Sequence, residues 1–442
     1  MKFNPRRTNM SQVMRSPIKG FVLAVRCLSA FLFCICINLE AQAASIVLST
    51  CAQTDVIGAI NSASNGDTIV CPAGSWSWSN VDITKNITLK GAGIGITNIS
   101  ITSNAGLESP ASYTGAFRVT GFTFISTGNF GDFDGATLYI RNGNGWRVDH
   151  NEFQIYSNSS SGSGGNGMHI KGDASGLIDH NRFVNGGGGS CMHACIQVSN
   201  SGTTSTNENA MNYSWLNFNS NNVLGSADHT VFVEDNYFRN TITCASHNPH
   251  TIYGRHGGVV VFRHNEIHGL NADNHPFIYT HAGFAFEISN NTWGNAGTSL
   301  YTLIDIAGGT GVIYNNTRTG NANYGIMLDF VRSTSSTGGS VTSFVPGYGT
   351  VSSSSSCSST EGYPCAEQPG RGQNNSSDPI YIWGNTSFPS MLLGSTTYIQ
   401  QGRDYFLNSG QKPGYTSYPY PHPLTSDTSL PPSPPKNLRV LP

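Results

Sequence analysis

The sequence predicts an all-β fold, a right-handed parallel β-helix with three sheets and an N-terminal capping helix. The main observation is a phrase that recurs as VDHNEF, IDHNRF, VEDNYF and FRHNEI, with weaker copies further along. Such self-similarity is typical of a solenoid, in which each unit buries its apolar face only by stacking on a neighbour. A buried asparagine at each turn can then hydrogen-bond from coil to coil. The asparagines of the repeat are Asn151, Asn181, Asn236, Asn265, Asn291, Asn316 and Asn385.

The composition agrees with an extracellular β-solenoid. Of the 442 residues, 51 are glycine and only 11% are charged, and the formal net charge is −2. The sequence has no polybasic tract, which argues against nucleic acid as a partner.

Residues 1–43 have the pattern of a secretory signal peptide. Basic residues precede an apolar stretch from Cys27 to Leu39, and Ala41-Gln42-Ala43 is a small-residue cleavage site. The apolar stretch is too short for a good transmembrane segment, so we expect no membrane span. We therefore expect a secreted protein, extracellular or periplasmic, whose mature chain begins at Ala44.

One β-helix domain is expected over residues 44–425, because stacked repeats extend a single core. Apolar residues at helical spacing from Asp55 to Ala63 predict a short helix that covers the open end of the solenoid. The Ser/Gly-rich stretch 333–375 is expected to be a loop insertion, and residues 400–425 a tail packed along the outside. Residues 426–442 are interpreted as a Pro-rich linker. We expect the protein to be a monomer.

Seven cysteines remain after removal of the signal peptide. In an oxidising compartment we expect Cys51–Cys71 to clamp the N-terminal cap and Cys357–Cys365 to close a loop. The pairing of the other three stays open: Cys191, Cys195 and Cys244.

The position two residues before each repeat asparagine defines a column of outward side chains, because residues alternate between the two faces of a strand. Its first members are three carboxylates, Asp149, Asp179 and Glu234, followed by Arg263. Like charges at strand spacing repel unless a cation or a pKa shift relieves them. Calcium, which prefers oxygen ligands, is one solution and makes these three acids a candidate metal site. The alternative is that they are solvated residues beside the asparagine ladder.

A second sheet is predicted from the segments 138–141, 168–171, 251–256 and 277–281. Cations interleaved with aromatic rings on a flat sheet suit an anionic polysaccharide, since rings stack on sugars while Arg and Lys meet carboxylates. The alternative is a face that is merely solvated. The outward residues of this sheet include Tyr139, Arg141, Lys171, Tyr253, Arg255, His256 and His281.

These features resemble the pectin-lyase-like superfamily of right-handed β-helix proteins. Within it, Arg255-His256-Gly257 followed by Asn265 resembles the arginine-containing strand of the chondroitinase B and alginate lyase family. The resemblance implies that Arg255 assists elimination. That family also has a lysine base one coil earlier and acids that bind calcium. The matching stretch here, residues 226–229, has no lysine, and Lys171 belongs to an earlier repeat.

The expected function is therefore a polysaccharide lyase that cleaves a uronic-acid polymer by β-elimination. The expected reacting groups are Arg255 and His256, with Lys171 as base or carboxylate clamp and His281 or Tyr253 as proton donor. Two alternatives remain: an inverting glycoside hydrolase using Asp149/Glu234 or Asp173/Asp179, and a non-catalytic glycan-binding or adhesive protein. The residues expected to bind substrate are Tyr139, Arg141, His169 and Arg263.

Overall fold

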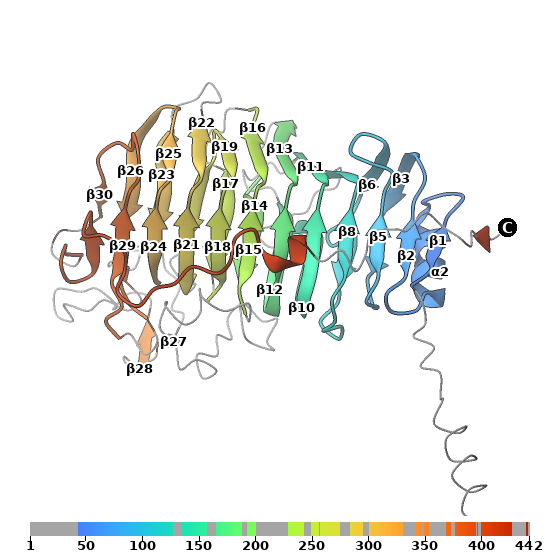
Figure 1. The fold of residues 1–442 in the computed structure, drawn as a ribbon, viewed down its shortest axis with the longest axis horizontal. Helices are drawn as coiled ribbons and strands as arrows, with labels where there is room; N and C mark the ends of the chain where they lie inside the picture. Colours follow the sequence, from blue (N-terminus) through green and yellow to red (C-terminus); the bar gives the residue numbers. More distant parts are fainter. Residues whose placement is uncertain are drawn as a thin grey trace, which may run out of the picture. The chain divides into compact units, whose positions relative to one another are not determined.

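The strands stack in parallel register from coil to coil, so the predicted right-handed parallel β-helix is confirmed (Figure 1). Among the described residues no helix is long and apolar enough to cross a membrane. The structure is a computed structural model that describes residues 43–126, 135–156, 165–187, 192–199, 229–242, 249–255, 257–274, 283–294, 300–329, 342–345, 349–352, 368–372, 376–394, 396, 399–426 and 439–440.

Each coil contributes a strand to three faces, which we call A, B and C. Face A consists of β4 (Val81–Asp82), β7 (Leu107–Ser109), the first parts of β10 (Ala136–Asp149) and β12 (Asn166–Asp179), β14 (Ala194–Ser199), β17 (His250–Arg255), β20 (Asn271–Asn274), β23 (Leu300–Ile306), β26 (Ala322–Leu328) and β30 (Leu392–Leu393).

Face B carries the residues that precede the asparagine turn. It consists of β1 (Ser45–Val47), β2 (Thr68–Val70), β5 (Thr88–Lys90), β8 (Arg118–Thr120), the second parts of β10 and β12, β15 (Val231–Glu234), β18 (Val259–Arg263), β21 (Ala285–Ser289), β24 (Thr310–Tyr314), β29 (Ile380–Trp383) and β31 (Tyr405–Leu407).

Face C follows the asparagine turn, and three further strands lie outside the faces. Face C consists of β3 (Gly74–Trp78), β6 (Thr97–Ile101), β9 (Thr123–Ser126), β11 (Glu152–Tyr156), β13 (Arg182–Gly187), β16 (Tyr237–Asn240), β19 (Glu266–His268), β22 (Thr292–Gly294) and β25 (Thr317–Arg318). The others are β27 (Thr342–Val345), paired antiparallel with β28 (Gly349–Ser352), and β32 (Arg439–Val440), paired with β1.

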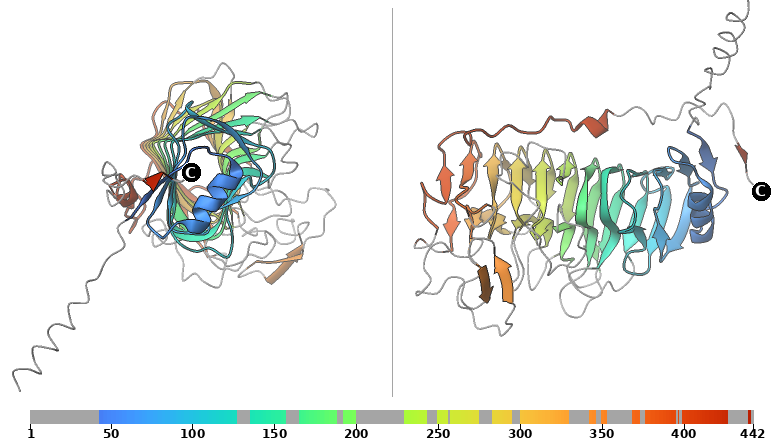
Figure 2. Two further views of the ribbon diagram at one scale, coloured as in Figure 1. Left: turned by 90° about the vertical axis from the view of Figure 1, so that its right-hand side faces the viewer. Right: turned by 90° about the horizontal axis from the view of Figure 1, so that it is seen from below.

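The N-terminal end of the solenoid is covered as predicted. Helix α2 (Gln53–Ser62) lies across the first coil (Figure 2) and buries Val56, Ala59 and Ile60 against the core. The predicted Cys51–Cys71 disulfide is present beside it. Cys195 is a buried free thiol, and the predicted Cys357–Cys365 pair lies outside the described residues.

A continuous ladder of asparagines sets the register of the coils. The side-chain Oδ1 of Asn265 accepts hydrogen bonds from the backbone N–H and the side-chain amide of Asn236, at 3.0 and 3.1 Å. Asn265 in turn donates to Oδ1 of Asn291, and Asn291 donates to Asn316. Buried amides of this kind are stable because every donor and acceptor has a partner.

The residue before each ladder asparagine has a left-handed backbone. His150, His180, Asp235 and His264 have φ values between 54° and 57°. Asparagine, aspartate and histidine tolerate this region better than β-branched residues do, which explains the short polar residue at this point of the repeat. The tight turn aims the following asparagine into the core.

We predict that Asn265→Ala destabilises the protein, because it leaves the N–H groups of Asn236 without an acceptor. Each buried group left unsatisfied costs about 1–3 kcal/mol, so the free energy of unfolding should fall by at least that amount. Chemical denaturation followed by circular dichroism measures it. Thr292→Ala, at an exposed position of β22 in the next coil, is the control. Equal stability of the two variants would contradict the role of the ladder.

Candidate functional site

The outward side chains of face A form two columns that run across the strands. Tyr139, His169, Gln197 and Tyr253 are aligned in register on β10, β12, β14 and β17. Two residues further along the same strands, a second column consists of Arg141, Lys171, Ser199 and Arg255. The structure therefore brings three of the predicted cations into one row beside the predicted rings.

The cations lie against the aromatic rings. The guanidinium of Arg141 is 4.6 Å from the centre of the Tyr139 ring, and the ammonium of Lys171 is 5.8 Å from it. Arg141 also forms an ion pair with Glu108 at 2.7 Å. Lys171 and Arg255 are 6% and 5% exposed, so both charges are largely removed from water. A charge held in a partly dry site attracts an anion more strongly than one in bulk solvent does.

His169, in the first column, is held in place by one residue of each column. Its Nε2 is 3.0 Å from the Ser199 hydroxyl and 3.1 Å from the side-chain amide nitrogen of Gln197. The amide can only donate, so Nε2 accepts and the ring proton lies on Nδ1. The Tyr139 and His169 ring centres are 5.2 Å apart.

A second ring cluster surrounds Tyr253. The Tyr253 ring centre is 4.5 Å from that of His193 and 5.2 Å from that of His250. The Nδ1 atom of His250 is 2.9 Å from the amide oxygen of Asn271 and 3.1 Å from a carboxylate oxygen of Asp273. A carboxylate that contacts an imidazole nitrogen fixes the orientation of the ring.

Acidic residues continue the first column beyond the cations. Asp273 on β20 pairs with Tyr253, and Asp305 on β23 pairs with Asp273. Burial, and secondarily the charge of Asp329, raises the pKa of Asp305 to about 8. Face A thus changes from basic to acidic along the stack.

Face B shows the predicted column in the predicted register: Asp149, Asp179, Glu234 and Arg263 are aligned on neighbouring strands. The charges, however, are balanced by arginine and not by a vacant cation site. Arg118 binds Asp149 through two bonds of 2.7 and 2.6 Å, and Arg147 binds Asp179 at 2.8 and 2.7 Å. Glu234 accepts two bonds from Arg263, at 2.9 and 2.6 Å.

These bonds correct the calcium prediction for the three acids, whose oxygens already accept hydrogen bonds from guanidinium groups and, in Glu234, also from the backbone N–H of His422. Among the residues that the structure describes, no cluster of three or more His, Cys, Asp or Glu could hold a metal ion. Asp149 and Glu234 also lose the role of a hydrolase pair, because each is bound to arginine. Asp173 of the other pair contacts His229.

The pKa of Asp149 reflects this pairing. Burial alone would raise it, but the hydrogen bonds from Arg118 and His150 and the charge of Arg147 hold the pKa well below its ordinary value of 3.8. In Glu234 burial outweighs the attraction of Arg263, and the pKa is raised. Neither carboxylate has the surroundings of a metal ligand.

Residues 412–426, which we call the strap, lie along face B and cover the paired charges (Figure 2). Arg263 donates to the carbonyl oxygens of Tyr418 and Pro419, each at 2.7 Å. The backbone N–H of His422 donates to Glu234, and Arg147 donates to the carbonyl of Leu424. This placement removes Arg263 from the predicted substrate-binding set, since it lies on another face under the strap.

Two predicted residues, His256 and His281, lie outside the described residues. The segment 277–281 was expected to form the strand after β17. The strand in that place is β20, Asn271–Asn274, six residues earlier. Alternation of apolar and polar residues alone does not distinguish these two windows, and pairing with Tyr253 decides between them.

The sequence analysis missed several groups on face A: His193, Gln197, Ser199, His250, Asp273 and Asp305. The available signal was the alternation in the segment Ala194–Ser199, which matches that of Met168–Lys171. The interval of 55 residues between Asn181 and Asn236 hid this coil, because its own strand on face A carries no copy of the phrase.

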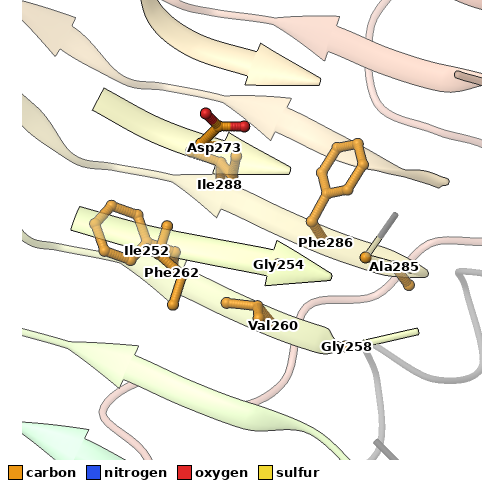
Figure 3. A pocket seen from close by; sticks show the side chains of 10 residues that line it. Ile252, Gly254, Gly258, Val260, Phe262, Asp273, Ala285, Phe286 and Ile288 are labelled. Atoms are coloured by element: carbon orange, nitrogen blue, oxygen red, sulfur yellow. The ribbon is translucent and has the colours of Figure 1, made fainter. Parts of the chain in front are cut away.

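A small cavity of about 20 Å³ lies inside the solenoid beneath this site (Figure 3). Its walls include Ile252, Val260, Phe262 and Phe286, and Asp273 has the only polar side chain among the residues that line it. An apolar void of this size is a packing gap, far smaller than the pockets that bind small molecules.

No family model and no curated protein matches the sequence. Solved structures that share its architecture include a PL6 family alginate lyase, with a TM-score of 0.41, 15% identity and coverage of 82% of this chain and 53% of that one.

Two further solved structures are similar. One is a PL6 family polysaccharide lyase from Pseudopedobacter saltans, with a TM-score of 0.38, 13% identity and coverage of 90% of this chain and 97% of that one. The other is the catalytic domain of a GH87 α-1,3-glucanase, with a TM-score of 0.34, 12% identity and coverage of 85% and 69%. This chain spans about half of the first alginate lyase. At these identities and TM-scores the likeness assigns neither a family nor a reaction.

We predict that Asp149→Asn lowers the free energy of unfolding at neutral pH by up to roughly 3–5 kcal/mol, the cost of breaking a buried ion pair. Because the folded pKa of Asp149 is depressed, its stabilisation is present above about pH 4 and is lost as the pH falls toward the folded value. The difference from wild type should therefore shrink in acid, as measured by denaturation at several pH values. Glu266→Gln, at an exposed carboxylate on face C, should change stability by less than about 0.5 kcal/mol at every pH.

Proposed function

We propose that the protein is a polysaccharide lyase that cleaves a uronic-acid-containing polymer by β-elimination on face A. The observation that supports this proposal is the row of Arg141, Lys171 and Arg255 beside Tyr139 and Tyr253. Arg141 and Lys171 are one strand apart, and Arg255 follows two strands later, so the row extends over roughly 14 Å at about 4.8 Å per strand. That is long enough to meet more than one carboxylate of an extended chain.

The chemistry requires a cation near the reacting uronate. Neutralising the C6 carboxylate makes the neighbouring C5 proton more acidic. Lys171 and Arg255 supply fixed charge for this purpose, and Tyr139 and Tyr253 offer ring faces on which sugars can stack. A base then removes the C5 proton. The sequence suggested Lys171 for this role, and His250, beside Tyr253 and held by Asp273, is a second candidate for the base.

We propose that the protein encounters its substrate outside the cytosol. The Cys51–Cys71 disulfide persists in oxidising compartments, and the signal peptide expected at residues 1–43 would direct the chain there. Extracellular or periplasmic uronate polymers are therefore the class to test.

We expect the purified protein to produce chain ends with ultraviolet absorbance from alginate, pectate or a glycosaminoglycan, since elimination forms a conjugated C4–C5 double bond. Arg255→Ala should lower kcat about 10²–10³-fold, the usual effect of removing one group that stabilises developing charge. Lys171→Ala should lower kcat/KM at least 10-fold. Arg239→Ala, at an exposed arginine of β16 on face C, is the matched control and should retain full activity.

Other outcomes would separate the alternatives. New reducing ends without a rise in absorbance would indicate a hydrolase. Saturable binding without any cleavage would indicate a glycan-binding protein. Equal activity of Arg255→Ala and wild type would refute the assignment of face A.

A further inference from the structure

One buried acid on face A, Asp305, has an unsatisfied carboxyl oxygen within the part of the chain that the structure describes. Asp305 lies on β23, its side chain directed outward because Ile304 and Ile306 on either side belong to the core. It is 8% exposed, and its Oδ1 atom is buried with no hydrogen-bond partner among the described residues. Leaving a buried carboxyl oxygen unsatisfied costs about 1–3 kcal/mol, so a purely structural residue would seldom be kept in this state.

The charged groups that face Asp305 are themselves acidic. Asp273 faces it from β20, one strand toward the cation row, and Asp329 follows β26 on the other side. Burial disfavours the ionised form, and a second negative charge disfavours it further. The two effects raise the pKa of Asp305 to about 8, so that the carboxyl is protonated at neutral pH.

Asp305 differs in protonation from the arginine-bound Asp149 on face B. Asp149 is held ionised by arginine, whereas the pKa of Asp305 is raised, which keeps its proton. A neutral carboxylic acid next to a row of permanent cations is an arrangement that separates proton donation from charge neutralisation.

We propose that Asp305 is the proton donor to the leaving group in the elimination reaction. This inference rests on the proposed function and adds the group that the cations cannot provide, since arginine remains charged at any working pH. Asp305 lies two strands from Tyr253, roughly 10 Å along the stack. A uronate bound with its carboxylate toward the long side chain of Arg255 can direct its C4–O bond, and the sugar attached through that oxygen, toward Asp305.

In the proposed elimination two bonds of the sugar break, C5–H and C4–O. A base takes the C5 proton, and the C5–H electron pair forms the C4–C5 double bond. The C4–O bond breaks, and its electron pair passes to the leaving oxygen. Asp305 gives that oxygen a proton and becomes a carboxylate, after which solvent returns a proton to Asp305 and accepts the one held by the base.

The test compares wild type and Asp305→Asn on each of two substrates. On the natural polymer the variant should lose 10²–10⁴ in kcat, the usual contribution of general acid catalysis. On a uronide with a dinitrophenyl group on O4, which leaves without a proton, the loss should fall below about 10-fold. Equal losses on both substrates, or no loss on either, would overturn the proposal. If wild type eliminates neither substrate, the proposed function itself is wrong.

The pH profile gives a second and independent readout. Wild type should lose kcat on the polymer above about pH 8 as Asp305 ionises. Asp329→Asn removes the facing negative charge, lowers the Asp305 pKa and should move this alkaline limb to lower pH with the fold intact by circular dichroism. In Asp305→Asn the limb should disappear from the residual activity. An alkaline limb that is the same in all three proteins would assign it to another group and exclude Asp305 as the donor.

Discussion

The asparagine ladder is the interaction on which the rest of the structure depends. Each amide of the ladder accepts from the coil before it and donates to the coil after it, so the coils cannot slip by one residue without leaving buried groups unpaired. A slip of one residue would also turn every outward side chain inward. The columns of charge on the outer faces exist because this register is held over many coils.

The two outer columns have opposite characters because their charges are balanced differently. On face B, Asp149, Asp179 and Glu234 each receive two hydrogen bonds from an arginine, and the strap contacts Arg147, Arg263 and Glu234. Buried pairs of this kind are costly to form and more costly to break, so they specify an arrangement more than they stabilise it. Face A instead holds cations at one part of the stack and acids at another.

That separation of charge along face A supports the proposal that this face is the catalytic one. Lys171 and Arg255 are nearly buried, and Asp305 is buried with a raised pKa. Perturbed titratable groups that converge on one surface are a feature of functional sites. Groups that must interact with a substrate are not paired with one another, and this leaves their pKa values shifted. On face B the same residue types neutralise each other, which is why an acidic column in the sequence did not correspond to a metal site.

The repeat by itself determined the β-helix, the ladder, the capping helix and the alignment of Asp149, Asp179, Glu234 and Arg263, because alternation and turn chemistry are local properties of the chain. It also indicated the row of Arg141, Lys171 and Arg255. Only the tertiary structure decided which partners each charge has. Arg118 and Arg147 reach the acids of the following coil, the strap arrives from the far end of the sequence, and β20 takes the place expected for 277–281. Such contacts depend on which strands become neighbours, and no spacing within one coil encodes that.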